Sequence, residues 1–189
     1  MGYSTAKQKI TYEAYLQMEA ISDIRYEFYY GEILAMDGGT PIHNILVQNT
    51  SQTIREKIQR KGCQTFTENV RLELEAEGYY VYPDVMLVCN ESEWKQNLSL
   101  KSAELIVEVL SDSTLQYDKG QKLASYLKIP SLSYYLLVSQ KETRVEVYEK
   151  IEKGWKFNLY ESAKEEIPLG LLGFSLSVEE LYKGISFES

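Results

Sequence analysis

The hydrophobic and polar positions of this chain change repeatedly between the period of a helix and the period of a strand, which predicts a mixed α/β fold. The expected helices cover residues 11–21, Thr40 to Gly62, 117–128 and a short segment from Ser177. The expected strands are two within 25–36 split by Gly31, then 64–74, 79–89, 103–111, 134–139, and a hairpin of 144–149 with 155–160. Helix and strand segments therefore follow one another in the order α, ββ, α, βββ, α, β, ββ, α.

The helix starts have recognisable caps. Thr11 is a good N-cap, and Thr40 is followed by Pro41 at the first helical position. Ser177-Val178-Glu179-Glu180 resembles a capping box. In the long helix from Thr40 we expect one apolar face, made of Ile42, Ile45, Leu46, Ile54 and Ile58.

Two of the strand segments, 79–89 and 103–111, are nearly continuous apolar runs. Such runs are typical of strands that are covered on both faces. We therefore expect these two strands at the centre of the sheet.

The composition is that of a globular protein, and 189 residues with 44% hydrophobic content are interpreted as a single domain, 1–189. No apolar run approaches the ~20 residues that span a bilayer, so we expect a soluble protein without a membrane partner. Cys63 and Cys89 lie far apart, and the Met1 end resembles no secretory signal. Reduced thiols and a cytoplasmic location are the resulting expectations.

The 16 tyrosines and the net charge of −8 are the unusual numbers. Because tyrosine suits half-wet sites, we expect many of the rings at sheet edges, a site rim or an oligomer interface. The negative charge opposes binding of a polyanion, since Lys and Arg supply much of the affinity for nucleic acid. A metal site built of carboxylates would make the net charge of the chain more negative before its metal binds.

Two acidic residues stand inside the apolar runs. Asp84 follows Pro83 in one, and Glu108 interrupts the other. A buried carboxylate is costly unless its charge is compensated, and a divalent metal would compensate two carboxylates on adjacent strands with the hard oxygen ligands that Mg²⁺ prefers. For either residue alone, a structural salt bridge or a cap is an equal alternative, whereas the pair favours a site.

The helix over 117–128 carries a stripe of Asp118, Lys122 and Tyr126. An Asp118–Lys122 surface pair is the simplest interpretation of that spacing. Because only a short loop joins the Glu108 strand to this helix, Lys122 could instead point back at the site and stabilise phosphate charge.

Further candidates are less specific. Glu27 is a possible third acidic group, while the lone His43 and Glu68 are weak candidates. The chain has no phosphate-binding loop, dinucleotide fingerprint, zinc-protease motif or nucleophile elbow, so nucleotide hydrolysis, zinc proteolysis and serine hydrolysis lack support.

Five segments in order resemble the Uma-two family, which has the restriction-endonuclease-like PD-(D/E)xK fold. They are Tyr26–Ile33, Thr40–His43, Tyr82–Val88, Leu105–Ser111 and Tyr117–Tyr126, and the match runs from about Tyr12 to Tyr182. The resemblance implies a core of αβββαβ type, with an added N-terminal helix and β-hairpin and a C-terminal β-hairpin.

The resemblance also implies residue roles. Asp84 and Glu108 would bind Mg²⁺ or Mn²⁺, with the Val109 backbone carbonyl as a further ligand and Glu27 as an additional acidic group. The residue two after Glu108 is Leu110, where the superfamily has lysine. The resemblance suggests a lysine supplied by the next helix, here Lys122 with Tyr126 one turn further, and Lys119 is the fallback.

The resulting hypothesis is a metal-dependent DNA endonuclease, with homodimerisation expected because nucleases of this fold often pair their sites. Two alternatives stay open. One is a catalytically weak or inactive member of the fold that binds nucleic acid or a protein. The other is a metal-dependent hydrolase of small phosphate esters, which fits the acidic charge better than DNA does.

Overall fold

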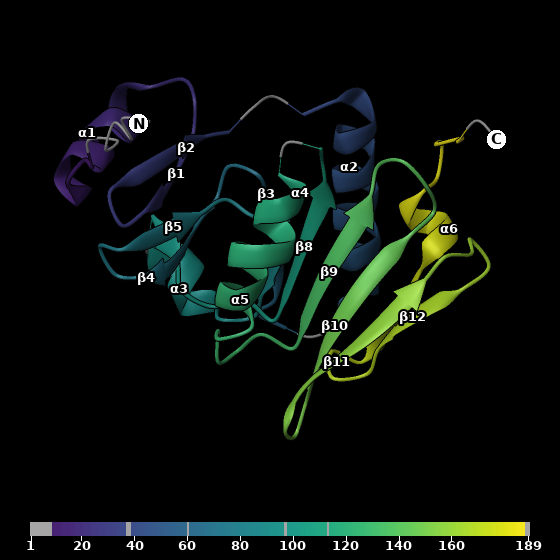
Figure 1. The fold of residues 1–189 in the computed structure, drawn as a ribbon. Helices are drawn as coiled ribbons and strands as arrows, with labels where there is room; N and C mark the ends of the chain where they lie inside the picture. Colours follow the sequence, from purple (N-terminus) through teal and green to yellow (C-terminus); the bar gives the residue numbers. More distant parts are fainter. Residues whose placement is uncertain (1–8, 37–38, 60, 97, 113, 188–189) are drawn as a thin grey trace.

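The computed structural model describes residues 9–36, 39–59, 61–96, 98–112 and 114–187, and these form three β-sheets with helices packed on them (Figure 1). The helices are α1 (Tyr12–Ile21), α2 (Pro41–Lys57), α3 (Glu91–Gln96), α4 (Leu115–Tyr117), the π-helical turn η1 (Asp118–Lys122), α5 (Leu123–Tyr126) and α6 (Val178–Leu181). The strands are β1 (Tyr26–Tyr29), β2 (Glu32–Ala35), β3 (Gln64–Thr67), β4 (Arg71–Glu75), β5 (Tyr79–Val81), β6 (Val85–Val88), β7 (Ser99–Leu100), β8 (Leu105–Leu110), β9 (Tyr134–Ser139), β10 (Val145–Ile151), β11 (Gly154–Tyr160), β12 (Glu166–Leu169) and β13 (Phe174–Ser177).

The largest sheet has six strands in the order β11-β10-β9-β8-β6-β3. Strands β8 and β9 are parallel, and the other pairs are antiparallel. As the apolar runs predicted, β6 and β8 are neighbours in the interior of this sheet, with Val85 opposite Val107. The mixed α/β fold expected from the sequence is therefore confirmed.

Alternate residues of β8 enter two different cores. Val107 packs with Leu46 of α2 on one face, whereas Ile106 packs with Tyr126 of α5 on the other. Figure 1 shows α2 and the α4–α5 segment on opposite sides of the sheet. Because successive strand side chains point to opposite faces, Glu108 lies on the α5 face, toward Tyr126.

Two of the expected strands are each divided between sheets. Segment 64–74 forms β3 and β4, and segment 79–89 forms β5 and β6, so that β4 and β5 join a five-stranded sheet in the order β2-β1-β5-β4-β7. The chain leaves the large sheet at Glu68, whose φ of 42° is in the left-handed region, and returns at Asp84, whose carbonyl accepts the Glu68 N–H at 3.2 Å. Both acidic residues therefore lie where the chain crosses between sheets.

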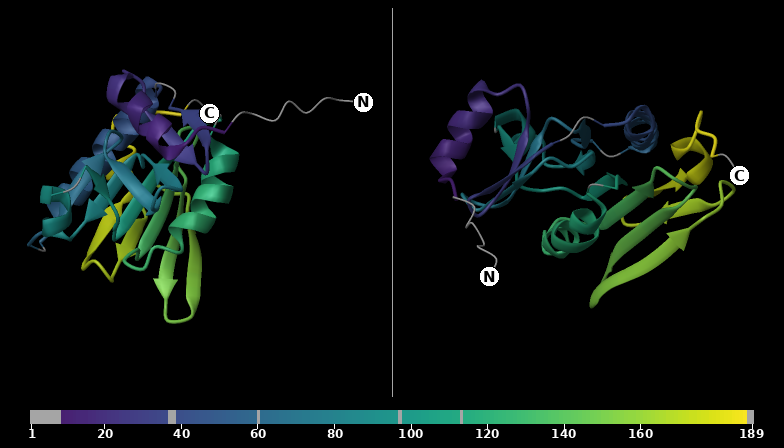
Figure 2. Two further views of the ribbon diagram at one scale, coloured as in Figure 1. Left: turned by 90° about the vertical axis from the view of Figure 1, so that its left-hand side faces the viewer. Right: turned by 45° about the horizontal axis from the view of Figure 1, so that its top comes forward.

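The N-terminal helix packs on the five-stranded sheet. Thr11 caps α1 by accepting the Ala14 N–H, as predicted, and Tyr15 of α1 is buried against Phe28 and Tyr80. Figure 2 shows α1 beside the β1–β2 hairpin, away from the C-terminal strands. This hairpin carries Glu27 on β1.

Several local expectations were wrong. Helix α2 ends at Lys57 rather than near Gly62. Of its predicted apolar face, Leu46 and Ile54 are buried and Ile58 packs on the same core, whereas Ile42 and Ile45 near the helix start are exposed. Helix α6 begins after Ser177 as expected, but the Ser177 side chain makes no capping hydrogen bond. The sequence reasoning also missed α3, β7 and the β12–β13 hairpin.

The cysteines are a further correction, since Cys63 and Cys89 form a disulfide instead of two separate thiols. The register of β3 against β6, with Gln64 opposite Val88, brings the two cysteines together just beyond the ladder. The cytoplasmic location thereby loses its argument from reduced thiols and stays a prediction.

The tyrosines are also more buried than expected. Tyr15, Tyr80, Tyr126, Tyr134 and Tyr135 are among the largest fully buried side chains. Burial is tolerated because the hydroxyls find partners, such as Glu108 for Tyr126 and the Asp118 carbonyl for Tyr135. Within the described residues, no helix is long and apolar enough to span a bilayer.

Candidate active site

A cavity of about 380 Å³ opens where the two large sheets, the start of α2 and the turn η1 meet. Its lining includes Glu27 of β1, His43 of α2, Asp84, Glu108 of β8 and Lys122 of η1. Residues predicted to form the site from five separate segments therefore share one cavity.

Asp84 and Glu108 are held together by the pairing of β6 with β8. The backbone N–H of Asp84 donates to Glu108 Oε2 at 3.3 Å, and the N–H of Val109 donates to Asp84 Oδ2 at 2.7 Å. Both acidic residues are buried. The Glu108 carboxylate is thus held by the backbone N–H of Asp84, and the Asp84 carboxylate by the N–H of Val109, the residue after Glu108.

Lys122 reaches the same place from the helical segment. Its Nζ lies 2.9 Å from Glu27 Oε1, 3.1 Å from Glu108 Oε1 and 3.5 Å from Asp118 Oδ1. Asp118 and Lys122 are buried in η1, so the interpretation as a surface pair was wrong. The lysine points back at the carboxylates, as the alternative interpretation required.

Tyr126 and Glu27 complete this group. The Tyr126 hydroxyl donates to Glu108 Oε1 at 2.7 Å, and the backbone N–H of Tyr82 donates to Glu27 Oε1 at 3.1 Å. Glu27 Oε2 is buried without a hydrogen-bond partner among the described residues. A buried, unpartnered carboxylate oxygen facing a cavity is the kind of atom that a cation satisfies.

Asp118 is a site residue that the sequence reasoning did not select. Its side chain lines the cavity and contacts Lys122. The signal that could have found it was present, because Asp118, Lys122 and Tyr126 follow one another at intervals of four residues. That spacing was interpreted as a surface feature instead.

For Glu108 and Lys122, burial and the charge of the partner shift the pKa in opposite directions. Burial raises the pKa of Glu108 well above its ordinary value, and the nearby Lys122 opposes that rise. Burial by itself would lower the pKa of Lys122, but Glu108, Glu27 and Asp118 raise it well above the ordinary value, so the lysine is cationic at neutral pH. One ammonium group faces the four carboxyl groups of Glu27, Asp84, Glu108 and Asp118, and the crowding of these acidic groups also raises the pKa of Glu108.

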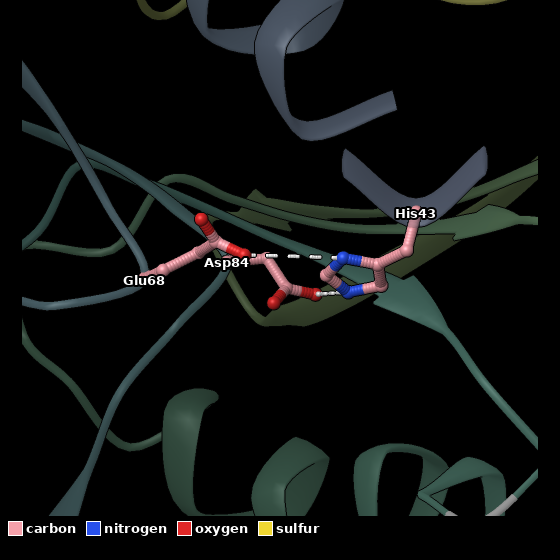
Figure 3. Close-up of side chains that lie close together, drawn as sticks. All are labelled: His43, Glu68 and Asp84. Carbon is pink, nitrogen blue, oxygen red and sulfur yellow. Dashed lines mark ion pairs between the residues drawn. The ribbon is translucent and has the colours of Figure 1, made fainter. Parts of the chain in front are cut away.

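The two weak candidates His43 and Glu68 also lie beside Asp84 (Figure 3). His43 Nε2 is 3.3 Å from Asp84 Oδ2, and His43 Nδ1 is 3.9 Å from Glu68 Oε1. Burial lowers the pKa of His43, but the hydrogen bond and charge of Asp84, together with the charge of Glu68, raise it above the ordinary value overall. One ligand atom from each of the three residues falls within 4.8 Å of the others.

Two remaining candidates have different outcomes. Lys119 Nζ bonds Glu146 Oε1 at 2.6 Å, and Lys119 is not part of the cavity lining, so the fallback lysine lies away from the site. Val109 lines the cavity, but the contact seen is that of its N–H, and a role for its carbonyl stays a prediction.

The donor set suits a hard divalent cation. Carboxylate oxygens are the ligands that Mg²⁺ and Mn²⁺ take in proteins, and Asp84, Glu108 and Glu27 bring such oxygens to one cavity. The excess of carboxyl groups over cationic side chains and the unpartnered Glu27 Oε2 agree with this assignment.

Comparisons with known proteins give the same fold and family. Residues 12–179 match the model of the Uma2 family, described as "Putative restriction endonuclease". Two similar proteins come from Synechocystis sp.: "Uncharacterized protein slr1290" is 30% identical over 95% of this chain and 94% of its own length, and "Uncharacterized protein sll1609" is 36% identical over 77% and 84%. A crystal structure described as a putative nuclease belonging to DUF820 from Anabaena variabilis superposes with a TM-score of 0.72 at 16% identity, covering 92% of this chain and 97% of that one.

Proposed function

This chain belongs to the Uma2 (Uma-two) family and has a nuclease-type fold, and from that premise we propose that it is a metal-dependent endonuclease that hydrolyses phosphodiester bonds in DNA. The observation that carries the proposal is the contact of Lys122 Nζ with Glu108 Oε1, beside the backbone bonds that join Asp84 to Glu108 and Val109. This arrangement brings two carboxyl groups that would bind the metal, and the ammonium group of Lys122, to one cavity, although lysine is missing at Leu110.

The roles follow from what each side chain touches. Asp84 and Glu108, with the Val109 carbonyl, would hold Mg²⁺ or Mn²⁺. Such an ion activates a water molecule and stabilises the leaving oxygen. Lys122 would bind a non-bridging phosphate oxygen and offset the charge that develops on the phosphate. Tyr126 keeps Glu108 in position through its hydroxyl, and Glu27 orients the lysine.

The test is cleavage of plasmid DNA by purified protein with Mg²⁺ or Mn²⁺, in the wild type and in Asp84→Ala. We expect the variant to lose at least about a thousandfold in rate, because it lacks the carboxylate that would hold the metal and that accepts the Val109 N–H. Exposed Glu152→Gln, in the β10–β11 turn, is the matched control and should cleave like the wild type. Cleavage that persists in Asp84→Ala would exclude this site.

A hydrolase of small phosphate esters is the second candidate. The net charge of −8 disfavours a polyanion, and about 380 Å³ is a volume that holds a small molecule. Nucleotide monoesters and diesters assayed beside plasmid DNA separate the two substrate classes.

Homodimerisation would place two such cavities on one DNA duplex, and analytical ultracentrifugation measures it directly.

A further inference from the structure

His43 and Glu68 form a second side of the cavity that the proposed hydrolysis does not use. Glu108 already accepts hydrogen bonds from Lys122, Tyr126 and the Asp84 N–H. Asp84 Oδ2 accepts the Val109 N–H and also faces the imidazole of His43, whose Nε2 is 3.3 Å away. Figure 3 shows the His43 ring turned toward the carboxylates of Asp84 and Glu68.

Three separate segments bring these ligands together. His43 lies in the first turn of α2, whose Thr40 cap accepts the His43 N–H at 3.1 Å. Glu68 and Asp84 stand opposite each other where the β3–β6 ladder ends, joined by the Glu68 N–H to Asp84 carbonyl bond. The three side chains are therefore fixed by backbone pairing and by a helix start.

The imidazole is also placed by a close backbone approach. A Cβ added at Gly39 would lie 2.8 Å from His43 Nδ1 and 3.2 Å from Cγ, so a side chain at position 39 would displace the ring. His43 Nδ1 is buried and has no hydrogen-bond partner among the described residues, since Glu68 Oε1 is 3.9 Å away, beyond hydrogen-bond distance. A polar ring atom that is buried without such a partner, beside two carboxylates, is a second and independent sign of a ligand.

We infer that His43, Glu68 and Asp84 form a divalent-cation subsite with one nitrogen and two oxygen donors, which prefers Mn²⁺ to Mg²⁺. Imidazole is a good ligand for transition metals, whereas Mg²⁺ takes oxygen and keeps its water. Asp84 would be shared between this subsite and the Glu108 side. The inference concerns metal binding and rests on the proposed function only in sharing Asp84.

The sequence makes the test unusually specific, because the chain contains one histidine. Pulsed electron paramagnetic resonance of Mn²⁺ bound to the untagged protein detects hyperfine coupling to an imidazole nitrogen, and that nitrogen can belong only to His43. We expect the coupling in the wild type and its loss in His43→Ala. We also expect Mn²⁺ affinity, measured by calorimetry, to fall at least about tenfold in His43→Ala and in Glu68→Gln.

Two variants keep the result interpretable. Gly39→Ala leaves all three ligands in place but should weaken the nitrogen coupling by moving the ring, and exposed Glu152→Gln should bind Mn²⁺ like the wild type. Mn²⁺ that binds without nitrogen coupling overturns the subsite and leaves the Asp84–Glu108 proposal standing. Failure of the wild type to bind Mn²⁺ overturns the subsite as well, while DNA cleavage with Mg²⁺ decides the nuclease proposal separately.

Discussion

The groups on the two sides of Asp84 differ in their contacts and in the burial of their side chains. The lysine side is formed by Glu27, Glu108, Asp118, Lys122 and Tyr126. All five side chains are buried, and Lys122 Nζ lies 2.9, 3.1 and 3.5 Å from the carboxyl groups of Glu27, Glu108 and Asp118. On the histidine side, formed by His43 and Glu68, the contacts are 3.3 and 3.9 Å long and the Glu68 side chain is 35% exposed.

This difference in burial and contacts suggests a different role for each side. A buried ion-pair cluster with its hydrogen bonds already made resists rearrangement, because breaking it leaves charges without partners. A looser group near the solvent has room for an added ligand. The lysine side therefore holds Glu108 in a fixed position as a ligand for the proposed catalytic metal, and the histidine side has room for a further cation beside Asp84.

Removing the lysine should have the largest effect. Lys122→Met leaves Glu27, Glu108 and Asp118 buried without their cation, so we expect a loss of about 3–5 kcal/mol in the free energy of unfolding. DNA cleavage should be abolished as well. Urea denaturation measures the stability, and Lys119→Met is the matched control, because Lys119 is half-exposed and Glu146 keeps its contact with Arg144. Equal losses in the two variants would contradict the assignment of Lys122 to the site.

The disulfide gives the next largest effect and tests how the histidine side is held. Cys63 and Cys89 close the β3–β6 pair at the end opposite Glu68 and Asp84. Replacing both with Ser should cost about 2–4 kcal/mol in the free energy of unfolding, since the unfolded chain regains the freedom of the closed loop.

Mn²⁺ affinity should nevertheless stay unchanged in this double variant, because the backbone ladder from Gln64–Val88 to Thr67–Val85 still fixes the register. Wild-type protein with and without reductant is the control for the stability measurement. Loss of Mn²⁺ binding on reduction would show that the ladder alone does not position the histidine side.

Tyr126→Phe is a milder change on the lysine side. The hydroxyl that donates to Glu108 Oε1 at 2.7 Å is lost while Lys122 remains, so thermal or urea unfolding should show a loss of about 1–3 kcal/mol. Cleavage should slow through the turnover number more than through substrate affinity, because Glu108 is less firmly held. Tyr148→Phe, a half-buried tyrosine in β10, is the control and should change neither quantity beyond ~0.5 kcal/mol. No loss of stability in Tyr126→Phe would contradict the role given to its hydroxyl.

The same contrast explains what could be predicted from the sequence. Asp84 and Glu108 were found because each interrupts an apolar strand, and a carboxylate at a buried position needs a compensating charge. Lys122 was found through its place on the next helix together with the family resemblance. Those signals are local, and the same apolar runs predicted that β6 and β8 lie in the interior of the sheet.

What was missed depends on contacts that local patterns do not contain. His43 and Glu68 were named only as weak candidates, because they meet beside Asp84 where the chain crosses between sheets, and no periodicity in the sequence marks such a crossing. The Cys63–Cys89 disulfide depends on strand register in the same way. Ile42 and Ile45 fit a helical stripe, but which side of α2 is buried was decided by the sheet it packs on.

The smallest effect is expected at the cap that presents His43. Thr40 Oγ1 accepts the His43 N–H and also bonds Gln140 Oε1, whereas Ser177 stands at the same position of α6 without a side-chain bond. Thr40→Ala should therefore cost about 1 kcal/mol in urea denaturation, and Ser177→Ala should change stability by less than ~0.5 kcal/mol. Mn²⁺ affinity should fall in Thr40→Ala alone, because the first turn of α2 carries His43. If the two caps proved equivalent in both measurements, the position of His43 would have to come from Gly39 and Asp84 rather than from the helix start.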